Sequence, residues 1–202
     1  MKSIRVAVAA AAVGIALTAC SSPMQAGAAA VVGNERITTS KVNADSEAYK
    51  SALKQAKLTE EALGGVPVSH VVLQRLINVA VIKQLMARYN VQASETEVDA
   101  MLKDPGQYES AQINLLAAGV APSDARDYGR AMVGLSKLQK QFGNDQKLAQ
   151  EFGSIKPVLN PRYGTFNPQR SQENPGFFVD TGRFGKLTPQ QQPQQPATQA
   201  QG

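Results

Sequence analysis

Residues 69–89 read SHVVLQRLINVAVIKQLMARY, the most apolar stretch of the chain beyond its first twenty residues. At 100° per residue, several apolar side chains fall on one broad face of a helix. These are Val72, Leu73, Leu76, Ile77, Val79 and Ala80. Val81, Ile82 and Leu85 extend onto the opposite side. A helix that is apolar around most of its circumference needs partners on several sides, so this stretch is predicted to be the central helix of a helical domain.

The segment before this helix predicts a strand pair followed by another helix. Residues 30–38 (AVVGNERIT) place two short apolar runs around a Gly-Asn turn signal, which is typical of a strand, a tight turn and a return. Thr38 or Thr39 can then cap a helix that runs to about residue 57. Its inward residues at helical spacing are Val42, Ser46, Tyr49 and Leu53. Residues 64–67 (GGVP) break the chain before the central helix.

The segment after the central helix predicts three more helices. Ser94 and Glu97 form a capping box, followed by a short helix that packs through Val98, Met101 and Leu102. A turn at 104–106 precedes a helix from about Tyr108 to Ala118, which Gly119 ends. A further helix begins at 122–124, with apolar residues at spacings of three and four, and Gly143 fits its end. A helical turn over 145–152 and an extended stretch at 156–159 complete the prediction.

The N-terminus has the layout of an export signal. Lys2 and Arg5 precede an almost wholly apolar run over 6–16, which is too short for a lasting membrane span of roughly 20 residues. The run ends in Leu-Thr-Ala before Cys20, the pattern of a lipidated bacterial lipoprotein. The alternative is a secretory peptide followed by an incidental buried cysteine. Cys20 is the only cysteine and cannot form an internal disulfide, so we expect it to carry a lipid that anchors the protein to the outer face of a cell membrane.

These observations divide the chain into four parts. Residues 1–19 are the predicted signal peptide, and residues 20–29 are a tether of small residues. Residues 30–168 form the predicted domain, and residues 169–202 a loop and a Gln/Pro-rich tail. From residue 187 the tail is so poor in apolar side chains that we expect it to be disordered.

Catalysis, metals and nucleic acids are disfavoured by the residues available. His70 is the only histidine, so a paired-His metal site is excluded. We expect His70 itself to be a surface or capping residue. There is no phosphate-binding glycine loop and no long Lys/Arg cluster, so neither a nucleotide nor a nucleic acid is expected as a partner. The carboxylates Glu95, Glu97 and Asp99 are explained by helix capping. We therefore predict a protein that is not an enzyme and holds no cofactor.

Five stretches together resemble the N-terminal domain of the SurA, PrsA and trigger-factor type of chaperone. They are residues 30–33 (AVVG) with 37–38 (IT), 73–78 (LQRLIN), 89–91 (YNV) before the capping box, and 159–166 (LNPRYGTF). The resemblance implies a mainly α fold, a cradle of about five helices. It also implies a small element of two or three strands, in which the N-terminal strand pairs with the strand near 156–159 and joins the two ends of the domain.

The resemblance also implies a function. Members of this family often carry a parvulin-type isomerase domain of about 90 residues, for which this chain has no room. We therefore expect a membrane-tethered chaperone that binds unfolded, newly exported polypeptides without ATP and without isomerase activity. The side chains expected to contact such clients are Val72, Leu76, Met101, Leu116 and Met132. The two methionines are included because a methionine side chain adapts to many partners. The alternative is a structural adaptor lipoprotein that binds one envelope protein or cell-wall polymer.

Overall fold

The fold is that of a computed structural model, which describes residues 26–143, 145–167 and 176–179. The predicted signal peptide, Cys20 and the Gln/Pro-rich tail lie outside these residues. The described chain is mainly helical, as predicted. Its helices are α1 (Thr39–Gln55), α2 (Val68–Arg88), α3 (Glu95–Lys103), α4 (Ala111–Ala117), α5 (Ala125–Phe142) and α6 (Asp145–Ser154). Short 3-10 turns cover Glu60–Leu63, Pro122–Asp124 and Pro161–Tyr163.

A three-stranded antiparallel sheet joins the two ends of the domain. β1 (Ala28–Val32) lies between β2 (Glu35–Thr38) and β3 (Val158–Leu159). Val31 is opposite Arg36 on one side and Val158 on the other. Both the predicted strand pair and the pairing that the family resemblance implied are confirmed. β1 begins at Ala28, two residues before the predicted start of the domain, because residues 28–30 are already completely buried.

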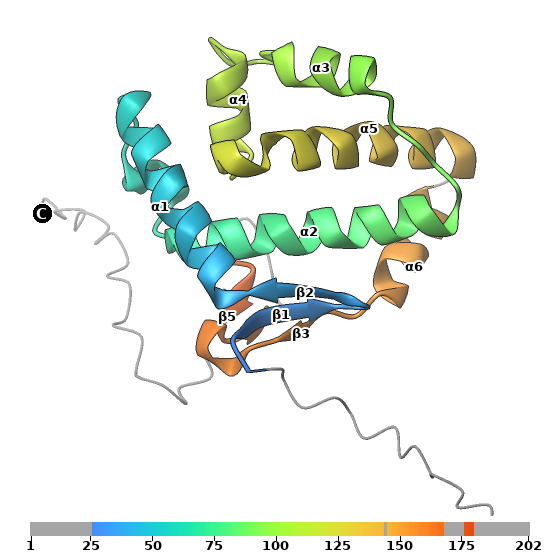
Figure 1. Ribbon diagram of the computed structural model, residues 1–202, viewed down its shortest axis with the longest axis horizontal. Helices are drawn as coiled ribbons and strands as arrows, with labels where there is room; N and C mark the ends of the chain where they lie inside the picture. Colours follow the sequence, from blue (N-terminus) through green and yellow to red (C-terminus); the bar gives the residue numbers. More distant parts are fainter. Residues whose placement is uncertain (1–25, 144, 168–175, 180–202) are drawn as a thin grey trace, which may run out of the picture.

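The central helix α2 lies between the sheet and α5, and α3 packs on the far side of α5 (Figure 1). Its buried residues occupy nearly every side of the helix, as its sequence predicts. α5 crosses it so closely that a Cβ atom on Gly134 would lie 2.1 Å from the Met86 sulfur. Gly134 therefore leaves the space that the buried Met86 side chain fills.

α1 is fixed by its cap and by its inward face. The Thr38 hydroxyl accepts a hydrogen bond from the Lys41 amide, and Val42, Ser46, Tyr49 and Leu53 are all buried, as predicted. The buried Asp45 carboxylate accepts hydrogen bonds from the Lys41 ammonium at 2.8 Å and the Ser123 hydroxyl at 3.0 Å. The Ser123 bond ties α1 to the turn before α5, and the Lys41 ammonium adds a second tie through the Asp124 carboxylate at 2.6 Å.

α4 is shorter than its sequence predicts. The prediction began at about Tyr108, but the helix begins at Ala111, because the Ser110 hydroxyl accepts a hydrogen bond from the Ile113 amide and serves as the N-cap. Tyr108 stays exposed. The connection between α3 and α4 is therefore longer than expected.

A second, two-stranded sheet was not anticipated. β4 (Thr165–Phe166) pairs with β5 (Phe178–Val179), which lies inside the stretch predicted as loop. The Phe178 side chain is buried and meets the His70 ring edge-on, with the two ring centroids 5.4 Å apart. His70 is thus half-buried in α2 against this aromatic group.

Candidate functional site

Helices α3 and α5 lie side by side at the edge of the molecule away from the sheet (Figure 1). They approach closely at Gly129, where a Cβ atom would lie 3.1 Å from the Leu102 side chain. The fully buried Val98 packs at the same crossing. Next to this crossing the two helices leave an open groove of about 450 Å³. Its lining residues are Glu97, Ala100, Met101, Asp104, Met132, Val133, Ser136, Lys137 and Lys140.

The structure brings together two of the five side chains that the sequence predicted as client contacts. Met101 of α3 and Met132 of α5 are half-buried and line this groove. Val72, Leu76 and Leu116 lie elsewhere, in the core, where they are 1%, 9% and 2% exposed. A bound chain could reach these three only if the helices around them separated. A contact between a client and any of the five residues remains a prediction.

Charged side chains line the groove together with the apolar ones. The Lys137 ammonium lies 2.7 Å from the Glu97 carboxylate and 2.8 Å from the Gln92 carbonyl oxygen. This bond to Lys137, together with the bonds from Ser94, lowers the pKa of Glu97 to about 2. Asp104 and Lys140 add one charge of each sign. The groove is therefore a mixed surface, with apolar side chains and two charges of each sign.

A row of ion pairs fixes the spacing of α3 and α5 on their outer side. Arg130 donates to Glu95 at 2.6 Å, and Arg126 donates to Asp99 at 2.9 Å and also to Glu95. The bond from Arg130 is the main cause that lowers the pKa of Glu95. Single exposed pairs contribute little, but a shared network restrains geometry more effectively. The three acidic residues of α3 thus join α3 to α5, beyond the capping role expected for them.

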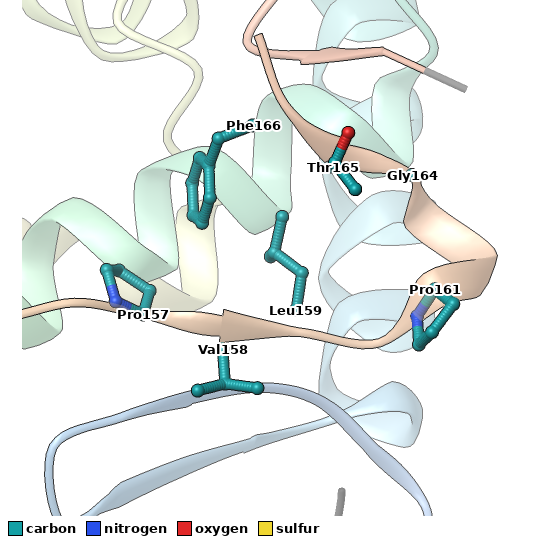
Figure 2. A pocket seen from close by; sticks show the side chains of 7 residues that line it. All are labelled: Pro157, Val158, Leu159, Pro161, Gly164, Thr165 and Phe166. Atoms are coloured by element: carbon teal, nitrogen blue, oxygen red, sulfur yellow. The ribbon is translucent and has the colours of Figure 1, made fainter. Parts of the chain in front are cut away.

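A second concave surface lies beneath the edge strand β3. It has a volume of about 540 Å³, and its lining includes Pro157, Leu159, Pro161 and Phe166. Figure 2 shows the Leu159 and Phe166 side chains on the same side of β3, with Val158 pointing to the other side. Val158 is 53% exposed, which is unusual for a large apolar side chain. Pro157 and Pro161 bracket the strand and lack the amide hydrogen that would extend the sheet.

The described residues hold neither a metal-binding cluster nor a membrane-spanning helix. Within residues 26–143, 145–167 and 176–179, no three His, Cys, Asp or Glu side chains are placed to hold a metal ion. No helix in this part of the chain is both long and apolar enough to cross a membrane.

The geometry defines a class of protein: a small helical domain whose ends are joined by a strand pair and whose outer helices present an open, methionine-lined groove. The sequence comparison agrees, since the model of the SurA-like N-terminal domain matches residues 1–112. The chain belongs to this family. Membership indicates a chaperone-type extracytoplasmic protein that binds polypeptides in general. No curated protein and no solved structure matches the chain significantly.

Proposed function

We propose that this protein is a membrane-anchored extracytoplasmic chaperone that binds unfolded exported polypeptides through the α3–α5 groove, without ATP and without isomerase or other enzymatic activity. The observation that carries the proposal is the convergence of Met101 and Met132 on one open groove in a member of a chaperone-type family. Unbranched, polarisable side chains adapt to apolar groups of different shapes, as a binder of many sequences requires.

The charged residues of the groove support the same function. Its two lysines and two carboxylates, Lys137, Lys140, Glu97 and Asp104, balance in charge. A groove with balanced charges neither strongly attracts nor strongly repels a client because of the client's net charge. Selection of clients would then depend on their exposed apolar side chains.

The membrane anchor is the second part of the proposal. A lipid on Cys20 would hold the domain at the extracytoplasmic face of the cell membrane, where exported chains emerge. A single acyl chain holds a protein on a membrane only marginally, whereas two or more chains anchor it stably. The lipoprotein pattern before Cys20 implies a lipid with more than one acyl chain. Metabolic labelling with a fatty-acid probe tests this directly, because labelling should disappear in Cys20→Ala.

The test of chaperone function is the light scattering of a refolding, aggregation-prone polypeptide in the presence of the mature chain, residues 20–202, without nucleotide. Suppression at near-equimolar ratio is the expected result. If scattering is unchanged while circular dichroism shows a folded protein, the generic chaperone function is wrong. A specific adaptor then becomes the better explanation, and the exposed Val158 beside the β3 groove is the surface to test for one partner.

A further inference from the structure

Arg75 has an unusual position in the middle of α2. Its guanidinium carbon lies 5.1 Å from the centre of the Tyr128 ring of α5. Its Nε atom is buried and donates to no acceptor within the described residues. No Asp or Glu in this part of the chain forms an ion pair with it. Among the described residues, Arg75 is therefore a half-buried cation without a counter-charge.

The surroundings of Arg75 are aromatic and rigid. Its electrostatic neighbours are the phenol groups of Tyr128 and the fully buried Tyr49 of α1. The Tyr49 hydroxyl donates a 2.6 Å hydrogen bond to the Leu116 carbonyl oxygen of α4, which fixes that ring. Side chains of α1, α2 and α5, together with the backbone of α4, thus define one site around the guanidinium.

Holding a cation there is costly, and stacking on a ring offsets only part of the cost. Burial lowers the pKa of Arg75, since it penalises the charged form. A guanidinium remains charged in proteins and presents five N–H donors in a fixed fork that matches a carboxylate. A carboxylate bound there would supply the missing charge and the missing acceptor together.

We propose that Arg75 is a binding site for a carboxylate of a bound polypeptide, at the junction of α1, α2 and α5 and separate from the methionine groove. This inference rests on the proposed function in that the carboxylate belongs to a client chain. The carboxylate is either an Asp or Glu side chain or the C-terminal carboxylate. One guanidinium flanked by two phenols suits a singly charged acid.

The first experiment does not depend on any client. The Nε–Hε resonance of Arg75, assigned by its absence in Arg75→Lys, is followed while the ¹⁵N-labelled mature chain is titrated with the α-amide of N-acetylglutamate, which carries a single carboxylate. A saturable shift is expected, and the α-amide of N-acetylglutamine, which carries no carboxylate, should produce none. If the resonance stays still with both compounds, or if both move it equally, the proposal is overturned.

The second experiment identifies the source of the carboxylate. Binding of an apolar peptide is compared with that of its versions containing one Glu or one Gln, each with a free or an amidated C-terminus. The preferred acid should bind about tenfold more tightly, because it adds a charge-assisted hydrogen bond to the guanidinium that the amide version lacks. This preference should disappear in Arg75→Gln and persist in Lys83→Gln, which removes an exposed cation from the same helix.

The outcomes separate the two proposals. A preference for an acid that survives Arg75→Gln overturns the carboxylate site and leaves the chaperone function intact. A saturable shift with the α-amide of N-acetylglutamate, but no binding of any peptide, supports the anion site and contradicts the polypeptide-binding function. If Arg75→Gln does not fold, Arg75→Lys serves in its place, because it keeps the charge but loses the fork and should reduce the preference.

Discussion

The Glu97 carboxylate of α3 binds the Lys137 ammonium of α5 at 2.7 Å, and the same carboxylate accepts a 2.8 Å hydrogen bond from the Ser94 amide. One side chain thus completes the capping box of its own helix and joins that helix to its neighbour. Both residues also line the methionine groove. The integrity of the groove is therefore linked to the charge of Glu97.

This linkage predicts how stability depends on pH. The pKa of Glu97 is about 2 in the folded protein and 4.5 in the absence of these partners. Because the folded-state pKa is lowered, the contribution of Glu97 is fully present above pH 4.5 and is lost as the pH falls through 2. The thermal midpoint of the natural protein should exceed that of Glu97→Gln at pH 6, and the difference should shrink toward pH 2.

Circular dichroism melts at several pH values measure this difference. Glu109→Gln, which removes a charge at an exposed position, is the control for a general effect of charge. A difference between the natural protein and Glu97→Gln that stays constant from pH 6 to pH 2 would contradict the assignment. Added salt should reduce the difference, since the pair is at the surface.

The close crossing of α2 and α5 predicts an asymmetry between two glycines. Gly134→Ala should destabilise the domain by about 1–3 kcal/mol, because the new methyl group must displace the buried Met86 side chain. Gly153→Ala in α6 meets nothing within 4 Å and should be neutral or stabilising by up to about 1 kcal/mol. Urea unfolding of both variants is the measurement, and equal midpoints would show that the crossing is looser than described.

Asp45 is predicted to contribute more to stability than its exposed neighbour. The Asp45 carboxylate is buried and bonded to both Lys41 and Ser123, whereas Glu47 pairs with Lys50 at the surface. Asp45→Ala should cost about 1–3 kcal/mol in the free energy of unfolding, because it leaves Ser123 and Lys41 without this partner. Glu47→Ala should change it by less than about 0.5 kcal/mol. Similar losses in both variants, measured by urea unfolding, would count against a specific role for the buried carboxylate.

The methionine groove predicts a separation of function from stability. Replacing both Met101 and Met132 by Gln keeps the length of the side chains but makes the groove polar, and it should abolish most suppression of aggregation. Replacing both methionines by Leu keeps the groove apolar and should retain most of the suppression of aggregation. Light scattering measures the effect, with thermal melts to verify folding. A folded Gln double variant with full activity would move client binding away from this groove.

Local signals made most of the fold predictable from the sequence. The Gly-Asn turn, the Thr38 cap and the capping box of Ser94 each act within a few residues, so the elements they define could be placed. Helical periodicity likewise revealed the buried face of α2. β5 was missed because two residues carry too little pattern to reveal a strand whose partner lies more than ten residues away.

The candidate site was harder to predict because it depends on contacts between distant residues. Periodicity identifies apolar positions but cannot separate a groove from a core, so Val72, Leu76 and Leu116 were chosen together with Met101 and Met132. The pairing of Glu97 with Lys137 crosses forty residues and leaves no local signal. Arg75 lies in a stretch that the resemblance had already singled out, yet its missing counter-charge is visible only in three dimensions.

The most direct test of the central claim is site-specific photocrosslinking. A photoreactive amino acid replaces Met101 or Met132 in the mature chain, and for comparison the exposed Gln55 at the end of α1. Each variant is irradiated with an unfolded exported polypeptide and with the same polypeptide in its native state. Crosslinks are expected from positions 101 and 132 to the unfolded form only, with few from position 55. Crosslinks of equal strength from all three positions, or none from the groove, would contradict client binding in this groove.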